Sequence, residues 1–361
     1  MSWISARWLW PILLGVVLVF APRSALAYPS PDTDYPAPHY QGEGNDPGVA
    51  IKPVADWVYL NNIRHDWQKW NNCGPTTTSM ALSFFGINAP QLTIANVLKP
   101  NPQDVNVSPD QIVQYVHNQG LDGQVRVNGN RDTLMLLLSN DIPVIAEQWI
   151  EDYGGMGHYR LVTGYNRANG TVTFDDSYYG PDRVWTWDEF EGHWLGFNTN
   201  RIYIPVYRRD QADVVRAILG EDANDWQMWL RAEAGARANL AVFGDDARVW
   251  FALGDALLNQ GRPEEAVDAY EQAYQLGLPW RYYWYQFGHF EALAKLGRWE
   301  RLLELTQPVL ESAPMHEEMY FYRGLAEQNL GNRDAAREDF RQAIANNRNF
   351  TRARTALQNL N

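Results

Sequence analysis

Cysteine is almost absent from this chain, in which Cys73 is the only cysteine among 361 residues. A single cysteine excludes an internal disulfide and a metal site built from several cysteines. Two interpretations of Cys73 remain: a small buried apolar residue or a reactive thiol that attacks a substrate. The cellular compartment bears on the choice, because exported proteins use cysteines mainly in pairs and an unpaired thiol there is exposed to oxidation.

Long hydrophobic runs are also scarce. The run at residues 8–20 follows the positive charge of Arg7 and precedes the small residues Ala25 and Ala27, and it is shorter than the roughly 20 residues that cross a bilayer. We therefore predict that residues 1–27 are a secretory signal peptide, with an uncleaved membrane anchor as the second interpretation. The residue directly after the predicted cleavage site is Tyr28 and not a cysteine, which argues against a lipoprotein. The mature chain is expected to be secreted or extracytoplasmic, without a transmembrane segment, and to keep its one thiol for chemistry.

Positive charge is in deficit, since 30 Lys and Arg residues against 43 Asp and Glu residues give a formal net charge of −13. Nucleic-acid-binding proteins need basic surface, so nucleic acid is not among the expected partners. The chain is 45% hydrophobic and 20% charged, which indicates well-packed globular domains. Its length predicts about two of them.

The first predicted domain mixes helices and strands. Residues 28–50 are rich in proline, glycine and acidic residues and are expected to be a linker, whereas helical patterns precede short β-type runs over residues 51–208 and predict an α+β domain. Asn169 and Gly170 lie between two of these runs and predict a hairpin in which both turn residues adopt positive φ. Helices are expected at 75–85, 108–119 and 131–140, and strands at 142–148, 159–165, 171–175, 184–187 and 201–207.

The C-terminal region, residues 245–361, contains an internal repeat. An aromatic residue followed four positions later by glycine recurs at Gly254, Gly288 and Gly324, which are 34 and 36 residues apart. The motif and its period resemble tetratricopeptide (TPR) repeats. The resemblance implies an all-α solenoid with a closing helix at residues 351–360 and a concave surface that binds a protein or peptide partner.

Two further expectations concern the helical region. Residues 209–244 are predicted to be a helical connector or a degenerate leading repeat. In the middle repeat, Gly297 lies two residues later than its counterparts, which predicts a longer first helix in that unit. We expect most of the aromatic residues at 280–290 to form inter-repeat core rather than to line the concave surface.

The residues around Cys73 favour a reactive thiol. Gly74 and Pro75 follow it, and proline is suited to the first turn of a helix, while Gly86 is suited to the helix end. Cys73 is therefore expected at a helix N-terminus. The exposed N–H groups and the helix dipole there favour the thiolate and lower the thiol pKa.

A cysteine nucleophile needs a base and a group that orients the base. His158 is the expected base because a glycine-rich segment leads into the strand that would hold it, and His65, eight residues before the cysteine, is the alternative. Asp175 and Asp176 end the strand that the hairpin brings back beside His158. Side chains alternate between the faces of a strand, so only one aspartate can point toward the imidazole. Gln68, five residues before Cys73, is the available side-chain amide for an oxyanion.

Three motifs over residues 55–205 resemble the C39-like peptidases, papain-type cysteine peptidases related to the bacteriocin-processing domain. The motifs are Gln68-x-x-x-x-Cys73-Gly74-Pro75, Gly157-His158-Tyr159-x-x-x-Thr163-Gly164-Tyr165 and Asp176-Ser177-Tyr178-Tyr179-Gly180. The resemblance implies a papain-like fold with Cys73 as nucleophile, His158 as base, Asp176 as the orienting acid and Gln68 as oxyanion donor. It implies a secreted cysteine peptidase that cleaves peptide or protein amide bonds through a thioester, without a metal or cofactor.

Two other functions fit the same residues. A papain-fold amidase or transpeptidase acting on cell-wall peptides would use identical catalytic groups, so the sequence does not separate it from a protein peptidase. A non-catalytic secreted scaffold would bind peptides through both domains. The complete set of Cys73, His158, Asp176 and Gln68 favours an enzyme, because a decayed domain would be expected to have lost one of them.

Overall fold

The computed structural model describes residues 49–150, 156–279 and 281–360. These residues fall within one compact unit that spans Pro36–Asn361. The predicted signal peptide and all but the last two residues of the predicted linker lie outside the described residues. Of the helices in the described ranges, none is both long enough and apolar enough to cross a membrane.

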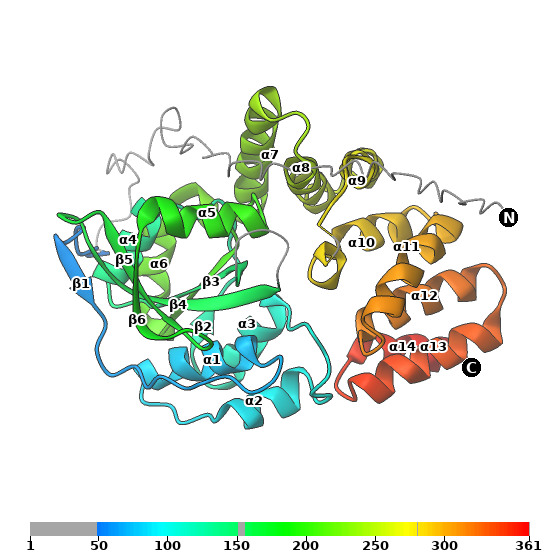
Figure 1. The fold of residues 1–361 in the computed structure, drawn as a ribbon, viewed down its shortest axis with the longest axis horizontal. Coiled ribbons are helices and arrows are strands. Elements are labelled where there is room, and N and C mark those ends of the chain that lie inside the picture. The colour runs from blue at the N-terminus through cyan, green and yellow to red at the C-terminus, as the bar shows by residue number, and fades with distance from the viewer. Residues whose placement is uncertain (1–48, 151–155, 280, 361) are drawn as a thin grey trace, which may run out of the picture. The chain divides into compact units, whose positions relative to one another are not determined.

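An antiparallel sheet forms the centre of the first domain (Figure 1). Its strands within the described residues are β1 (Trp57–Tyr59), β2 (Asp122–Gly123), β3 (Val144–Trp149), β4 (Gly157–Asn166), β5 (Thr171–Asp176), β6 (Gly180–Thr186) and β7 (Tyr203–Tyr207). Their order is β2-β7-β3-β4-β5-β6, and β1 pairs with the second half of β4. This arrangement confirms the predicted α+β class, and the predicted strands at 142–148, 159–165, 171–175 and 201–207 are present with shifts of at most two residues at their ends.

Helices cover both faces of the sheet, because the strands are apolar on both sides. Ile145 of β3 and Leu161 of β4 pack with one group of helices, whereas Val144 and Val162 pack with the other. The first group is α1 (Cys73–Phe84), α2 (Gln91–Leu98) and α3 (Pro109–Asn118); the second is α4 (Arg131–Ser139), α5 (Trp187–Phe197) and α6 (Ala212–Leu219). The sequence predicted α1, α3 and α4 but neither α2 nor α5.

The predicted hairpin joins β4 to β5, but its turn differs from the expected one. The strands pair from Asn166 and Thr171 onward, so the connection is a four-residue loop at 167–170 rather than a two-residue turn. Gly170 has φ +62°, and Asn169 is not among the residues with positive φ. The Asn169 N–H instead donates to the Asn166 side chain at 3.1 Å, an Asx-type bond that stabilises the longer loop.

Gly164 lets β1 approach β4 closely, and its replacement tests this packing. A Cβ atom at Gly164 would lie 2.4 Å from the carbonyl oxygen of Val58. Gly164→Ala is therefore expected to lower the free energy of unfolding, measured in urea, by about 1 to 3 kcal/mol. Gly192→Ala in α5 is the matched control: its Cβ meets nothing within 4 Å, so it should raise stability by roughly 0.5 to 1 kcal/mol. Equal effects of the two substitutions would contradict the packing described here.

Helices make up the described chain after β7. Two short 3₁₀ segments, η2 (Arg209–Gln211) and η3 (Gly220–Ala223), flank α6, and α7 (Asp225–Val242) leads to the repeats. Two repeats are regular helix pairs, α8 (Ala247–Asn259) with α9 (Pro263–Leu276) and α12 (Glu317–Asn329) with α13 (Arg333–Asn346). The predicted closing helix is present as α14 (Thr351–Leu360).

The middle repeat corrects one expectation. Its first helix, α10 (Gly288–Lys295), is shorter than α8 and α12, not longer, and α11 (Trp299–Ser312) follows it. A 3₁₀ segment, η4 (Tyr282–Trp284), precedes α10, so Gly288 begins a helix instead of lying in the middle of one. Most of the aromatic residues at 280–290 that the structure describes are core, as predicted: Tyr282, Trp284, Tyr285 and Phe290 are buried, while Tyr283 and Phe287 pack partly buried against them.

The repeated glycine has a packing reason in the two regular units. A Cβ on Gly254 would lie 2.5 Å from the ring of Tyr270, and one on Gly324 would lie 2.7 Å from the ring of Phe340. Each glycine in the first helix therefore makes room for an aromatic ring from the second helix. This pairing explains why glycine and the aromatic residue recur together in the sequence.

The helical repeats share a hydrophobic core with the sheet domain. Trp149 and Phe197 of the sheet domain belong to the same buried cluster as Tyr285, and the ring centroids of Phe197 and Tyr285 are 5.7 Å apart. At a second place, the Asn347 side chain donates to the Leu98 carbonyl at 2.9 Å. The two regions are thus packed together through both apolar and polar contacts.

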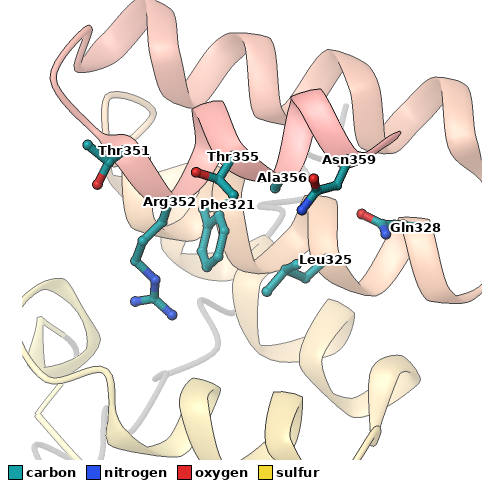
Figure 2. A pocket seen from close by; sticks show the side chains of 8 residues that line it. All are labelled: Phe321, Leu325, Gln328, Thr351, Arg352, Thr355, Ala356 and Asn359. Atoms are coloured by element: carbon teal, nitrogen blue, oxygen red, sulfur yellow. The ribbon is translucent and has the colours of Figure 1, made fainter. Parts of the chain in front are cut away.

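A hollow of about 430 Å³ lies between α12 and α14 (Figure 2). The Arg352 guanidinium lies over the Phe321 ring at 4.5 Å. The other side chains that line the hollow include both apolar and polar ones. The lining residues are Phe321, Leu325, Gln328, Thr351, Arg352, Thr355, Ala356 and Asn359.

Candidate active site

Cys73 is the first residue of α1, as the sequence predicted. Asn72 precedes the helix, and its side chain donates to Gln91 at 2.7 Å rather than capping the helix. The first N–H groups of a helix have no partner within it, so they and the helix dipole favour negative charge at Cys73. The residue is half-buried, and its sulfur lies 4.0 Å from the carbonyl oxygen of Gly157. The thiol is therefore at a helix N-terminus beside the start of β4.

His158 is the second residue of β4 and is 1% exposed. Its Nε2 lies 3.0 Å from Oδ1 of Asp176. Because an ionised carboxylate can only accept, Nε2 carries the proton in this bond. Nδ1 is the ring nitrogen left for Cys73, and the interaction of the two side chains lowers the pKa of the thiol and raises that of the imidazole. The three side chains thus form a chain from sulfur to imidazole to carboxylate.

Asp176 ends β5 and pairs directly with Arg160 of β4. Its Oδ1 accepts bonds from His158 and from the backbone N–H groups of Tyr178 at 2.8 Å and Tyr179 at 2.9 Å. Its Oδ2 accepts from Nε of Arg160 at 2.9 Å. Burial raises the pKa of Asp176, but the bond and charge of His158 and the charge of Arg160 lower it by more, so the net pKa is well below the ordinary value. Asp176 is therefore held ionised.

Asp175 has a different environment, which resolves the choice between the two aspartates. Its Oδ1 accepts the backbone N–H of Asp182 at 3.0 Å, across the turn between β5 and β6. Alternation along β5 directs the two carboxylates to opposite faces, and Asp176 is the one that meets His158.

We expect Asp176→Asn to lower kcat/KM for peptide hydrolysis by about 10³-fold or more, because a neutral amide stabilises the imidazolium poorly and does not fix its tautomer. Asp175→Asn keeps an oxygen that accepts the Asp182 N–H and should stay within about threefold of the unsubstituted protein. The two variants, assayed side by side with one peptide substrate, are matched in chemistry and in sequence position. A larger loss from Asp175→Asn would contradict the assignment of Asp176.

The electrostatics of Cys73 and His158 favour an ion pair. Burial raises the pKa of the Cys73 thiol, but the hydrogen bond and charge of His158 lower it by more, with help from the Tyr159 N–H and the charge of Lys99. Burial lowers the pKa of His158, but its bonds to Asp176 and Cys73 raise it by more. A thiol pKa below its ordinary value and an imidazole pKa above its ordinary value together widen the pH range in which thiolate and imidazolium coexist.

Gln68 is anchored to the residue that follows Asp176. Its N–H donates to the Ser177 carbonyl at 2.9 Å, and its Oε1 accepts from the Ser177 hydroxyl at 2.8 Å. Because the amide oxygen is engaged, Nε2 is the end of the side chain that is left to donate to an oxyanion. Ser177 is thus a residue that sequence reasoning did not assign a role, although it lies within the motif that contains Asp176.

His65, the alternative base, lies beside the backbone of Asp176. Its Nε2 is 3.0 Å from the backbone carbonyl of Asp176, and its ring meets the Trp67 ring edge-on at 5.1 Å. It therefore contacts the backbone of Asp176, whereas His158 contacts the carboxylate itself.

Two buried ionisable side chains near the site, Arg160 and Glu147, were not predicted. Arg160 is 0% exposed and binds Asp176. Glu147 of β3 accepts the Tyr159 hydroxyl at 3.0 Å, and burial raises its pKa to about 8, so it is protonated at neutral pH. Both lie inside apolar strands, and a charged residue in a strand that is buried on both faces is the sequence signal that could have identified them. No cluster of three or more potential metal-ligating side chains occurs among the residues that the structure describes.

Family models match both regions of the chain. Residues 56–202 match the Peptidase_C39-like family, and residues 247–277 and 317–350 match the tetratricopeptide repeat. The chain therefore carries a C39-like peptidase domain followed by TPR repeats, in the predicted order. A search of curated proteins found no match.

Three solved structures are similar to less than half of the chain. The peptidase domain of Streptococcus ComA, described as a bifunctional ABC transporter involved in a quorum-sensing pathway, is 17% identical, with 41% of this chain and 100% of that chain covered and a TM-score of 0.33. A double-glycine-motif protease from an AMS/PCAT transporter, in complex with a leader peptide, is 15% identical, with 44% and 99% covered and a TM-score of 0.33. MamA from Desulfovibrio magneticus RS-1 is 18% identical, with 42% and 84% covered and a TM-score of 0.35. Likenesses this low in identity and TM-score carry no information about activity.

Proposed function

We propose that the protein is an exported cysteine peptidase that hydrolyses amide bonds in peptides or proteins, with its TPR repeats binding a partner or the substrate. The observation that carries the proposal is the chain of contacts from Cys73 through His158 to Asp176. The thiol lies at a helix N-terminus beside the start of the strand that carries His158, the imidazole lowers the pKa of that thiol, and the carboxylate holds one ring nitrogen at 3.0 Å. Export is proposed from the predicted signal peptide at residues 1–27.

The first half of the reaction is acyl transfer to sulfur. The Cys73 thiolate attacks the carbonyl carbon of the scissile amide, which forms a C–S bond and places negative charge on the carbonyl oxygen. The imidazolium of His158 then donates its proton to the departing amine as the C–N bond breaks. The products of this step are a free amine, a thioester on Cys73 and a neutral imidazole, so charge and protons balance.

The second half returns the enzyme to its starting state. Neutral His158 takes a proton from water, and the resulting hydroxide equivalent attacks the thioester carbonyl. The C–S bond breaks, the acid is released, and the thiolate and imidazolium re-form. Throughout both halves Asp176 keeps the proton on Nε2 of His158, which leaves Nδ1 as the nitrogen that exchanges protons.

The oxyanion formed in each half needs donors. The backbone N–H of Cys73 is one, because the first N–H groups of α1 have no partner inside the helix. The Nε2 group of Gln68 is the other, and the two bonds from Gln68 to Ser177 support its orientation. One such donor is typically worth about 10²- to 10³-fold in rate.

The repeats are proposed to bind a peptide segment of a partner or of the substrate. TPR arrays use their concave surface in this way. The hollow between α12 and α14 offers the partly buried side chain of Leu325 for apolar contact and the guanidinium of Arg352 for backbone carbonyl or carboxylate groups. This mixture suits an extended peptide better than a purely apolar ligand.

The test is hydrolysis of a mixture of unstructured peptides by the purified protein, with Cys73→Ser as the control. Mass spectrometry of the products is expected to reveal new amino and carboxyl termini that form with the unsubstituted protein and not with Cys73→Ser. Peptides that bind without being cut would contradict the proposal and favour a binding scaffold. Cleavage confined to cell-wall peptides would favour the amidase or transpeptidase alternative.

A further inference from the structure

Arg160 is a cation with no exposed surface. It lies in the middle of β4, two residues after His158, and is 0% exposed. Its guanidinium uses all three nitrogens as donors: Nε to Asp176 Oδ2 at 2.9 Å, Nη1 to Gln148 Oε1 at 3.0 Å and to the Trp149 carbonyl at 2.9 Å, and Nη2 to the Ile150 carbonyl at 3.1 Å. A buried charge persists only when it is paired and its donors are satisfied, and Arg160 meets both conditions.

The strand register explains why Arg160 meets the same carboxylate as His158. Arg160 is directly opposite Asp176 across the β4–β5 pair. Residues two apart on a strand share a face, so His158 and Arg160 approach Asp176 from the same side, one diagonally and one directly. Each takes a different oxygen: His158 binds Oδ1 and Arg160 binds Oδ2.

Aromatic rings enclose the guanidinium from the other side. The guanidinium carbon lies 4.7 Å from the centre of the Trp185 ring and 5.7 Å from that of Phe174. Cation–π contact and the fixed fork of donors leave Arg160 little rotational freedom. The carboxylate it binds is therefore held in one orientation.

Arg160 also affects the net charge of the site. If Asp176 were neutralised by His158 alone, a thiolate on Cys73 would be an uncompensated negative charge in a half-buried site. With Arg160 in place, one cation offsets Asp176, and the imidazolium of His158 is available to offset the thiolate. The four groups are then neutral as a set.

We propose that Arg160 is a positioning residue of the site: it fixes the carboxylate of Asp176 and supplies the positive charge that allows Cys73 and His158 to exist as a thiolate–imidazolium pair. The proposal rests on the function proposed above. Arg160 does not touch the thiol or the substrate, and it acts through Asp176 and through its charge.

Other titratable or charged groups surround this cluster, and the test accounts for them. Asp176, Tyr179 and Cys73 interact electrostatically with Arg160, while His193 stacks on Trp185 at 4.5 Å. The groups around the cluster are Cys73 from α1, His158 from β4, Asp176 from β5, Tyr179 from the following turn, Arg183 from β6, His193 from α5, and Lys99 and His65 from loops. Glu147 from β3 interacts electrostatically with Cys73 from the opposite face of the sheet.

The test compares Arg160→Gln with Arg160→Lys in the pH dependence of Cys73 alkylation by iodoacetamide. Glutamine keeps donors for Oδ2 but removes the charge, so the midpoint of the labelling rate should move up by about one pH unit or more. Lysine keeps the charge, so its midpoint should stay within about 0.3 units of the unsubstituted protein although it loses bonds to β3. The same order of midpoints is expected for the acid limb of kcat/KM.

Two controls separate charge from damage to the fold. Arg126 is also buried and donates to the Asp222 carbonyl at 3.1 Å, within the packing around Met228; Arg126→Gln should lower stability without moving the midpoint. His193→Gln removes the neighbouring imidazole and should leave the midpoint unchanged.

An unshifted midpoint in folded Arg160→Gln, or an equal shift in Arg160→Lys, would overturn the proposal for Arg160. Failure of the proposed function has a different signature, because Cys73 in the unsubstituted protein would then label only at the pH of an ordinary thiol. The alkylation assay needs no peptide substrate, so the two failures are distinguishable.

Discussion

Cys73→Ala is expected to reduce kcat/KM for peptide hydrolysis by at least about 10⁴-fold. The chain has no second thiol, and the imidazole of His158, held by Asp176, lowers the pKa of this one. Without it no thioester forms, and water activated by the remaining groups attacks an unactivated amide slowly. The measurement is the initial rate with a fluorogenic peptide at matched protein concentration.

The fold should tolerate this change, because Cys73 is half-buried at the first position of α1 and alanine is a good helix former. The melting temperature of Cys73→Ala is therefore expected to lie within a few degrees of the unsubstituted value. Each kcal/mol lost from the free energy of unfolding lowers the melting temperature by about 2 to 4 °C in a domain of this size. A folded Cys73→Ala protein that keeps a tenth or more of the activity, roughly 1.4 kcal/mol in barrier, would show that another group attacks the substrate.

His158→Ala is the second large effect, with kcat/KM expected to fall by about 10³-fold or more. The substitution removes the base and acid for both halves of the reaction, and it also removes the charge that lowers the pKa of Cys73. The loss should therefore be largest near neutral pH and smaller in alkaline solution, where the thiol ionises without help. Rates measured across the pH range report this change of shape.

His65→Ala is the matched control for His158→Ala. His65 also lies beside Asp176, but it contacts the backbone carbonyl at 3.0 Å and not the carboxylate. Its removal should leave kcat/KM within about tenfold of the value for the unsubstituted protein, which corresponds to a change of at most about 1.4 kcal/mol in the activation free energy. A loss from His65→Ala as large as that from His158→Ala would mean that the imidazole role had been assigned to the wrong histidine.

The candidate site was predictable from sequence where function depends on local pattern. A thiol followed by glycine and proline defines a helix start, and the hairpin between His158 and Asp176 brings the two strands together in a register that the sequence limits to one of two aspartates. Which aspartate faces the imidazole could not be decided from the residues alone. The register depends on a bulge between Val162 and Gly164, and a bulge of one residue exchanges the faces of a strand.

Contacts between residues that are far apart in the sequence could not be predicted, for a physical reason. Arg160 depends on Asp176 opposite it, on carbonyl groups at the end of β3 and on rings from β5 and β6, and no local pattern encodes such a combination. The prediction of a longer first helix in the middle repeat was wrong for a related reason. Tyr282, Tyr285 and Phe290 pack in a buried core that also contains Trp149 and Phe197 of the sheet domain. Tertiary packing there replaced part of the expected helix with a 3₁₀ turn.

The most direct test of the account is the rate of Cys73 alkylation by iodoacetamide from about pH 5 to about pH 9, read by intact mass, for the unsubstituted protein and for His158→Ala. If the Cys73 thiolate is coupled to His158, the labelling midpoint lies below the pKa of about 8.5 of a free thiol and is higher in His158→Ala. Coincident midpoints, or labelling only after denaturation, would contradict a thiolate coupled to His158.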